Sequence, residues 1–236
     1  MKNSNATPAP SAGATTELKR TERSKLKRLP KRGHYDFATV AAILDAGFLC
    51  HVGYVVDGAP LVTPTAYWRE GNRVYWHGSH ASRMLNTAAG GVPVCLTVAH
   101  VDGLVMARSA FHFSINYRSV MLMGTANVVT DPAYKKAALK EFVNRMAAGR
   151  WDELRPITAK ELKATTVLWM EIDEGSAKVR SGPPLDDADD YALPIWAGVV
   201  PIETVARKPV ADPRLDAAIP APTSIDDLRH LGLTRG

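Results

Sequence analysis

Short apolar segments separated by turn signals recur along this chain, and this pattern constrains its fold more than any other feature. An Asp57-Gly58 pair separates two such segments and predicts a two-residue hairpin turn. Glu70-Gly71-Asn72 predicts the next turn, so three strands follow one another as a meander. The segments that we predict as strands are residues 48–56, 61–69, 73–77, 92–100, 104–113, 120–129, 165–172 and 177–180, with Val101-Asp102-Gly103 as the turn that joins 92–100 to 104–113. Antiparallel strands in this number favour a closed or nearly closed barrel, because closure removes exposed edges.

Two helix starts are signalled within this β-rich pattern. Asp36 precedes an apolar stripe as an N-cap residue, and Gly47 follows that stripe as a stop. Asp131-Pro132 places an N-cap residue before a proline at the first helical position. We therefore expect a mainly β protein, an antiparallel barrel with short flanking helices.

Residues 74–85 carry the clearest chemical signal. They begin as an alternating aromatic strand, turn through Gly78-Ser79 and open a short helix. The first turn of that helix carries His80, Ser82 and Arg83. Backbone N–H groups, hydroxyls and a guanidinium at a helix start suit a phosphate, because the donors and the helix dipole point the same way.

Trp76 and His77 directly precede this turn and are placed to border a flat ring, so the segment predicts a phosphorylated, planar cofactor. Both residues also have a structural explanation. Trp76 alternates with Tyr75 along the strand, so one of the two rings must face inward and pack in the core. His77 can equally be a hydrogen-bonded histidine at the end of a strand.

The formal net charge of +5 does not by itself indicate nucleic-acid binding. Much of the basic excess lies between Lys19 and Arg32, and the rest of the chain is close to neutral. Residues 1–16 are mostly Ser, Thr, Ala, Asn and Pro, which cannot bury enough apolar surface to fold. We expect residues 1–28 to form a disordered, solvated basic tail, with contact to nucleic acid or to another subunit as the alternatives.

The character of the chain changes again after Ser181, where aspartates and prolines become frequent. Residues 191–201 are nevertheless apolar, and we expect this arm to wrap on the barrel or on a neighbouring subunit. The chain then divides into a tail over residues 1–28, a folded domain over residues 29–206 and a C-terminal extension over residues 207–236.

Cys50 and Cys95 lie within apolar runs, and the first residues lack the apolar segment of a signal peptide. We interpret both residues as reduced, buried thiols of a cytoplasmic protein. The sequence contains no stretch of about 18 apolar residues, so we expect no membrane contact.

Three segments in this order resemble the pyridoxamine 5′-phosphate oxidase-like proteins. They are Leu29-Pro30-Lys31-Arg32-Gly33-His34-Tyr35-Asp36, Tyr75-Trp76-His77-Gly78-Ser79 and Phe111-His112-Phe113-Ser114-Ile115-Asn116-Tyr117-Arg118-Ser119-Val120. Each motif is weak alone, whereas the three together are fairly specific. Within that superfamily, residues 29–205 are most similar to the flavin-nucleotide-binding branch that includes nitroimidazole-resistance proteins.

The resemblance implies an FMN-binding split β-barrel over residues 29–206. It also implies a homodimer with the flavin in a groove built from both subunits, and a reactive role for His77. The cofactor-binding residues that it implies, together with the phosphate segment above, are Pro64, Thr65, Trp76, His77, Gly78, Ser79, Ser82, Arg83, Asn116, Tyr117 and Arg118. Met84 departs from the pattern, because relatives often have a lysine there that adds a phosphate charge.

Several of these residues have structural alternatives. Arg83 can be a surface residue paired with an acid, and Arg118 can form a structural ion pair instead of binding an anion from a loop between strands. Pro64 removes a ladder donor from a well-patterned strand, which marks either a plain edge strand or an edge where ligand reaches the backbone.

The sequence lacks the motifs of several other enzyme classes: there is no Gly-x-Gly-x-x-Gly, Walker loop, Cys-x-x-Cys or His-Glu-x-x-His. We therefore predict an FMN-dependent oxidoreductase that reduces or oxidises a small planar molecule, since hydride delivery from a reduced flavin needs no protein general base. The deazaflavin F420 stays open in place of FMN.

Two alternatives remain. One is a non-catalytic protein that binds or senses a flavin. The other is a haem protein, because some split-barrel relatives bind haem through histidine and a barrel can bring distant residues together. The histidines available for this are His51, His77, His80, His100 and His112.

Overall fold

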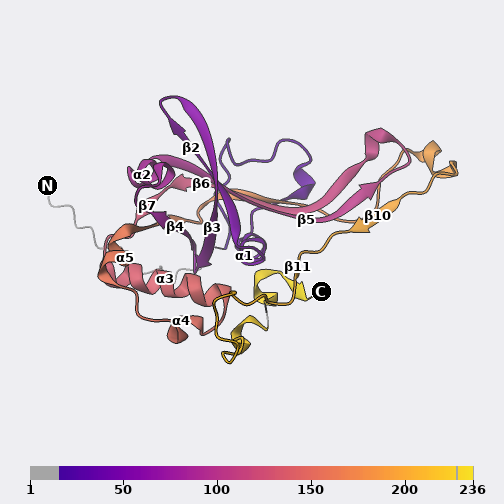
Figure 1. Cartoon of the computed structure of the whole chain (residues 1–236). Coiled ribbons are helices and arrows are strands. Elements are labelled where there is room, and N and C mark those ends of the chain that lie inside the picture. Colours follow the sequence, from indigo (N-terminus) through magenta and orange to yellow (C-terminus); the bar gives the residue numbers. More distant parts are fainter. Residues whose placement is uncertain (1–15, 227, 236) are drawn as a thin grey trace.

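The computed structural model describes residues 16–226 and 228–235. Its main element is a ten-stranded sheet in which every pairing is antiparallel (Figure 1). The strands are β1 (Gly33–His34), β2 (Leu49–Val56), β3 (Ala59–Glu70), β4 (Arg73–Ser79), β5 (Pro93–Met106), β6 (Ser114–Thr125), β7 (Asn127–Val128), β8 (Thr165–Glu171), β9 (Glu174–Arg180) and β10 (Gly198–Pro201). Two further strands, β11 (Val205–Ala206) and β12 (Thr234–Arg235), form a separate parallel pair. The predicted mainly β fold is confirmed.

Helices are short and flank the sheet. They are α1 (Phe37–Asp45), α2 (Arg83–Ala89), α3 (Pro132–Met146), α4 (Arg150–Glu153) and α5 (Ala159–Ala164), with single turns η1 (Pro30–Arg32), η2 (Ala110–His112), η3 (Ala188–Ala192), η4 (Thr223–Ile225) and η5 (Arg229–Leu231). Both predicted N-caps are confirmed, because the Asp36 carboxylate accepts the Thr39 N–H and the Asp131 carboxylate accepts the Tyr134 N–H. No helix in the described ranges is long and apolar enough to cross a membrane.

The strand order is β1-β9-β6-β5-β2-β3-β4-β8-β7. Strand β3 pairs with two different strands along its length. Residues 59–66 of β3 pair with β2, whereas residues 67–70 pair with β4. Asp57 and Gly58 take positive φ values of 50° and 79° in the turn before β3, as the sequence predicts for a tight hairpin. The bent strand divides the sheet into two halves that curve around one interior.

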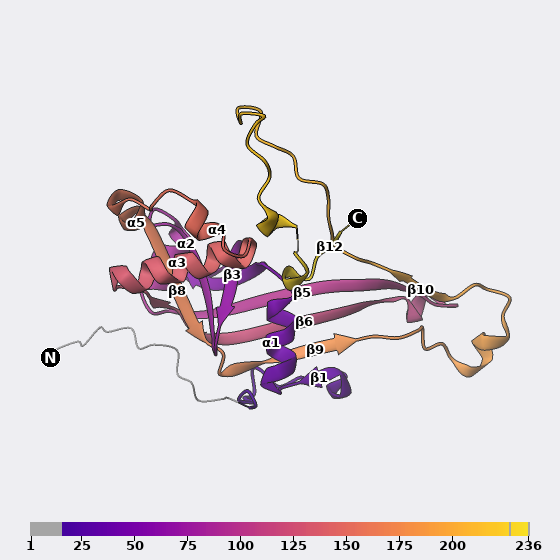
Figure 2. The ribbon, with the colours of Figure 1, turned by 90° about the horizontal axis from the view of Figure 1, so that it is seen from below.

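Two apolar cores result. The larger one lies inside the curved sheet under α1 and α2, and includes Leu44, Trp76 and Leu122. The smaller one lies where α3 packs across the outer face of β3, β4 and β8, and includes Trp68, Tyr75 and Leu139 (Figure 2). Tyr75 and Trp76 are both fully buried, because alternation along β4 directs the two rings into different cores.

The β5–β6 pair differs from the prediction. Residues 92–100 and 104–113 are not two strands joined at a turn: β5 runs unbroken through this region and contains a bulge between Val101 and Gly103. The Asp102-Gly103 pair, a turn signal in the sequence, is absorbed as one extra residue, because β6 pairs with β5 on both sides of it. Asn116, Tyr117 and Arg118 consequently lie within strand β6 and not in a loop.

This long hairpin projects from the body of the sheet, with β10 alongside its far end (Figures 1 and 2). The apolar side chains exposed on it and on the arm that returns beside it are Val101, Leu104, Phe111, Phe113, Ile115, Leu185, Tyr191, Leu193, Ile195, Trp196 and Val200. Phe111 is 88% exposed and Trp196 is 68% exposed. The projection therefore carries many apolar side chains that are exposed in this structure.

The N-terminal segment also differs from the prediction, which places a disordered tail as far as residue 28. Residues 1–15 of that tail lie outside the described residues. From residue 16 the chain follows the edge of the sheet: Leu18 is 2% exposed, and its N–H donates to the Tyr35 carbonyl. The Arg23 guanidinium donates to the Glu174 carboxylate on β9. Arg23 is thus held by an acid that is distant in sequence, a contact that the local composition could not reveal.

Candidate functional site

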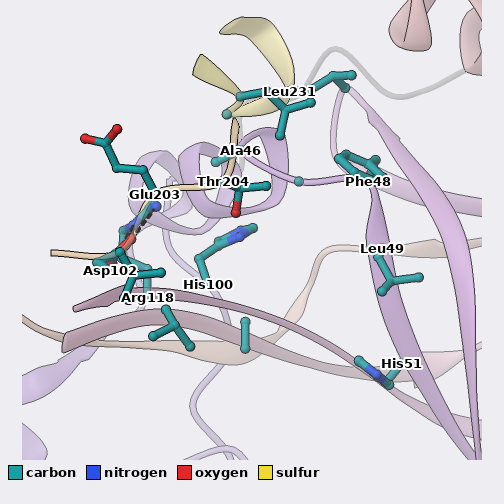
Figure 3. Close-up of a pocket in the computed structure, with 16 residues that line it drawn as sticks. Ala46, Phe48, Leu49, His51, His100, Asp102, Arg118, Glu203, Thr204 and Leu231 are labelled. Atoms are coloured by element: carbon teal, nitrogen blue, oxygen red, sulfur yellow. Dashed lines mark hydrogen bonds and ion pairs between the residues drawn. The ribbon is translucent and has the colours of Figure 1, made fainter. Parts of the chain in front are cut away.

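A cavity of about 520 Å³ opens where the turn between α1 and β2 meets β5 and the C-terminal region (Figure 3). Its volume lies within the range of small-molecule sites. The lining residues are Ala46, Gly47, Phe48, Leu49, His51, Ala99, His100, Val101, Asp102, Arg118, Ile202, Glu203, Thr204, Leu231, Gly232 and Leu233. Apolar and polar residues share the wall, and the polar side chains come from β2, β5, β6 and residues 203–204.

Two histidines line this cavity from strands that pair with each other. His51 lies on β2 opposite Thr97 of β5, and His100 lies three residues further along β5. The His51 side chain is exposed and makes no hydrogen bond within the described part of the chain. Both histidines line this cavity, but His100 is three residues from Thr97 and therefore lies on the opposite face of the sheet from His51.

His100 is more constrained than His51. Its Nε2 lies 3.0 Å from the Ile43 carbonyl oxygen and donates to it. Gly47 makes the space for this ring: a β-carbon there would lie 2.6 Å from the His100 Cε1 atom. The imidazole is therefore held against the C-terminal end of α1.

An ion pair forms one side of the cavity. Asp102, the extra residue of the β5 bulge, accepts hydrogen bonds from the Arg118 guanidinium at 2.8 and 2.9 Å. This hydrogen bond raises the pKa of Arg118 above its ordinary value. Among the predicted cofactor-binding residues Arg118 alone lines this cavity, and its charge is already balanced by Asp102.

The end of α1 that borders the cavity is fixed from two sides. The Asp45 carboxylate accepts from the Arg69 guanidinium at 2.9 and 2.5 Å. The Arg145 guanidinium on α3 donates to the Asp45 carbonyl oxygen, and the buried Tyr67 hydroxyl donates to the Leu44 carbonyl oxygen. Burial raises the pKa of Tyr67, so this hydroxyl stays protonated and acts as a donor.

The predicted phosphate segment forms a second polar region. Ser79 ends β4, and its hydroxyl accepts the Ala81 N–H at 3.2 Å. Ser82 is the N-cap residue of α2, but its hydroxyl makes no capping bond. Arg83 is exposed, and its guanidinium has no partner among the described residues. His80 precedes the helix instead of lying in its first turn.

Met84 explains part of this arrangement. It is 4% exposed and packs in the larger core with Leu85, which anchors the first turn of α2 to the barrel. The position that departs from the family pattern therefore has a packing role here, and Arg83 is left as the cation of that turn.

Trp76 is fully buried and His77 is partly buried. The Trp76 ring has no exposed surface, so it belongs to the core and is not available to border an added ring. His77 packs against Phe142, with 4.4 Å between ring centroids, and against Trp68. Burial lowers the pKa of His77, which keeps the ring neutral at pH 7. Its Nδ1 is buried without a hydrogen-bond partner.

Pro64 and Thr65 lie on β3 opposite His51 and Cys50. In the described structure β2 is the one strand paired to this half of β3, so Pro64 lies where the missing N–H breaks no second ladder. This edge position agrees with both sequence interpretations of Pro64.

Asn116 is buried and bonded at both ends of its amide. The oxygen accepts from the Arg180 guanidinium, and the nitrogen donates to the Gly182 carbonyl oxygen at 3.1 Å. Asn116 therefore joins β6 to the start of the C-terminal arm and has no polar atom left for a ligand. Tyr117, its partly buried neighbour on β6, pairs with Arg180 of β9.

The predicted site residues thus fall into three groups, on β3, on β4 with α2, and on β6, and Arg118 of β6 is the one that lines this cavity. The residues that sequence reasoning missed are the apolar turn after α1 and the C-terminal wall. A glycine and a phenylalanine at residues 47–48 gave a helix stop but no ligand signal.

Comparison with known proteins shows which family this chain resembles in sequence and in structure. Residues 36–179 match the family model described as pyridoxamine 5′-phosphate oxidase. The solved structure of the flavocytochrome Anf3 from Azotobacter vinelandii is similar, with 48% identity, a TM-score of 0.85 and coverage of 92% of this chain and 98% of that one. A comparison with curated proteins finds no match.

Two further solved structures are similar. The FAD and haem binding protein from Mycobacterium smegmatis shares 36% identity at a TM-score of 0.80, over 83% of this chain and 96% of that one. A candidate 5-nitroimidazole antibiotic resistance protein from Bacteroides thetaiotaomicron VPI-5482 shares 20% identity at a TM-score of 0.51, over 62% and 86%, and supports the fold alone. This chain therefore belongs to the pyridoxamine 5′-phosphate oxidase-like family of split-barrel proteins.

Proposed function

We propose that this protein is an oxidoreductase that binds both a flavin nucleotide and a haem and passes electrons between them. The observation that carries this proposal is the cavity, lined by the unpartnered imidazole of His51 together with apolar and polar side chains. The two relatives of highest identity described above, a flavocytochrome and an FAD and haem binding protein, support it.

The cavity residues fit a haem. A porphyrin is flat and mostly apolar, and Phe48, Leu49 and Leu231 offer apolar contact on different sides. An imidazole nitrogen would hold the haem iron in such a site. His51 has both ring nitrogens free for this, whereas His100 already donates to the Ile43 carbonyl. We assign His51 as the iron ligand and His100 as a residue that shapes the wall.

The exposed surface around α2 fits the phosphate of a flavin nucleotide. The Arg83 guanidinium is free to make a charge-assisted hydrogen bond, and the Ser82 hydroxyl has no capping duty. FMN and FAD share the phosphate next to the flavin, so these residues suit either one. We favour FAD over the predicted FMN because one relative is described as binding FAD.

Each cofactor supplies a different kind of electron chemistry when bound: a flavin accepts two electrons as a hydride, and a haem iron exchanges one at a time. The protein holds the two groups at fixed positions and keeps water from the apolar cavity walls. No catalytic acid or base is needed for this transfer. The partly buried, neutral His77 accordingly supports the barrel wall between Trp68 and Phe142, in place of the reactive role that the sequence suggested.

We further propose that the protein is a homodimer in which a second copy covers the exposed apolar projection of β5 and β6. Phe111, Phe113 and Trp196 are all exposed on this projection. Single exposed apolar residues are normal on a protein surface, whereas a group of them marks an interaction site. The predicted flavin groove between subunits then gains its second wall from the partner. Sedimentation of the purified protein at micromolar concentration tests this, and a monomer would contradict it.

Purified protein tests the proposed function directly. We expect flavin absorption bands and a Soret band in one sample, and mass spectrometry of the released ligands should identify FAD and protohaem; FMN or F420 would correct the flavin. Anaerobic photoreduction of the flavin should then be followed by reduction of the haem. If the protein binds a flavin but shows no Soret band after incubation with haemin, it binds a flavin and no haem. Binding of both groups without electron transfer would indicate a sensing protein.

A further inference from the structure

Two segments of the C-terminal region, residues 202–206 and 228–235, form one wall of the cavity, and we call them together the C-terminal strap. The strap residues that line the cavity are Ile202, Glu203, Thr204, Leu231, Gly232 and Leu233. The parallel pairing of β11 with β12 joins the two segments to each other. Figure 3 shows Thr204 and Leu231 on the same side of the cavity, above His100.

The second segment is docked by an unusually close contact. Gly232 has a φ of +70°, and a β-carbon there would lie 2.4 Å from the Ala46 carbonyl oxygen. Leu231 beside it is 4% exposed, and the His230 Nε2 donates to the Arg145 carbonyl oxygen at 2.6 Å. Ala46 itself lines the cavity, so the strap is docked against another part of the cavity wall.

The rest of the strap region has few attachments. The Ile202 N–H donates to the Asp102 carbonyl oxygen at 3.2 Å, which holds the first segment to the β5 bulge. Every residue from 207 to 221 is exposed. A segment with few buried contacts opens at low free-energy cost compared with global unfolding. The contacts at His230, Leu231 and Gly232 are therefore the ones that hold the second segment in place.

We propose that the C-terminal strap is a cover for the cavity, held shut by the docking of Gly232 against Ala46. A flat ligand enters when the strap is undocked and is retained when it is docked, so occupancy and docking stabilise each other. This rests on the proposed function for the identity of the ligand, a haem, but not for the geometry of the cover.

The test compares Gly232→Ala with Gly149→Ala. Both glycines have positive φ, +70° and +76°, but a β-carbon at 149 meets nothing within 4 Å, so that variant reproduces the backbone strain without the clash. Hydrogen exchange of the ligand-free proteins should rise in residues 228–235 for Gly232→Ala alone, with β5 and β6 unchanged. Haemin should then leave Gly232→Ala about tenfold faster than the wild type.

The dye 8-anilinonaphthalene-1-sulfonate gives a second probe of the cavity that does not depend on iron. Faster dissociation of both probes from Gly232→Ala, and of neither from Gly149→Ala, would support the cover. Unchanged exchange at residues 228–235, or raised exchange with both dissociation rates within twofold of the wild type, would overturn it. If haemin fails to bind the wild type while the dye binds, the haem assignment fails, and dye dissociation with hydrogen exchange still decides the cover.

Discussion

Asp102 and Arg118 hold the β5 bulge in place from opposite strands. Asp102 is the residue without a partner in the β5–β6 register, and Arg118 of β6 pairs with His100 across the same ladder. Their two hydrogen bonds fix the side of the cavity to which the Ile202 N–H also binds. A local irregularity in one strand thus sets the position of both a cavity wall and the strap.

Removing this ion pair should cost little global stability. The two side chains are 34% and 40% exposed, so we expect a coupling energy of about 0.5–1 kcal/mol between Asp102→Asn and Arg118→Gln. Urea unfolding of the wild type, the two single variants and the double variant measures it. A coupling energy of zero would show that the pair does not hold the bulge.

Replacing His51 should abolish iron ligation without disturbing the fold. Because the His51 imidazole has no hydrogen bond within the described chain, His51→Ala should change the melting temperature little while it removes or shifts the Soret band.

His100→Ala is the matched control for ligation. It loses the bond to the Ile43 carbonyl, so it should lower stability by about 1 kcal/mol and keep the axial ligand. Loss of the Soret band from His100→Ala, with His51→Ala unaffected, would reverse the two assignments.

Arg83→Ala should weaken flavin nucleotide binding. If its guanidinium meets the phosphate, the variant loses a charge-assisted hydrogen bond of about 1.5–3 kcal/mol, or roughly one to two decades in affinity. Titration of FAD and FMN into flavin-free protein measures this. Riboflavin, which lacks the phosphate, should bind wild type and variant alike, and Arg28→Ala provides an exposed control. An equal loss for riboflavin would reject the phosphate role.

Glu174 should make the attachment of the N-terminal segment sensitive to acid. Its hydrogen bond from Arg23 lowers the pKa of Glu174 to about 2, below the roughly 4.3 expected in an unfolded chain. Because the folded-state pKa is depressed, the stabilisation is present above about pH 4.3 and is lost as the pH falls toward 2.

Glu174→Gln should therefore lower the free energy of unfolding by about 1 kcal/mol at pH 7, and the difference from wild type should shrink between pH 5 and pH 2. Urea unfolding across this range checks it. Glu22→Gln is a suitable control, since that side chain is 83% exposed and lies 3.8 Å from its lysine. A difference that persists unchanged at pH 2.5 would contradict the assignment.

The sequence predicted the elements whose signals are local. The N-caps at Asp36 and Asp131 and the Asp57-Gly58 turn depend on neighbouring residues, and the structure has all three. The Asp102-Gly103 signal misled, because a turn and a bulge share the same residue types and the partner strand decides between them.

The cavity could not be predicted for a different reason. Its walls come from residues 46–51, 99–102 and 231–233, which strand pairing and a C-terminal return bring together. Trp76 shows the same limit: its sequence position is compatible with bordering a ligand or with core packing, and alternation along β4 buries it completely. Residue type predicted the chemistry that was available, and register decided which side chains were accessible.

Strand β4 contributes side chains to both apolar cores, and this restricts where a ligand can approach the strand. With Tyr75 filling one core and Trp76 the other, neither face of the strand is open along residues 73–76. Exposure begins only at its last residues, from His77 to Ser79, next to the start of α2. A ligand can therefore contact β4 at its C-terminal end and not along its faces. A β-carbon at Gly78 would lie 3.0 Å from the Leu85 side chain, so a larger residue there would narrow this point of access.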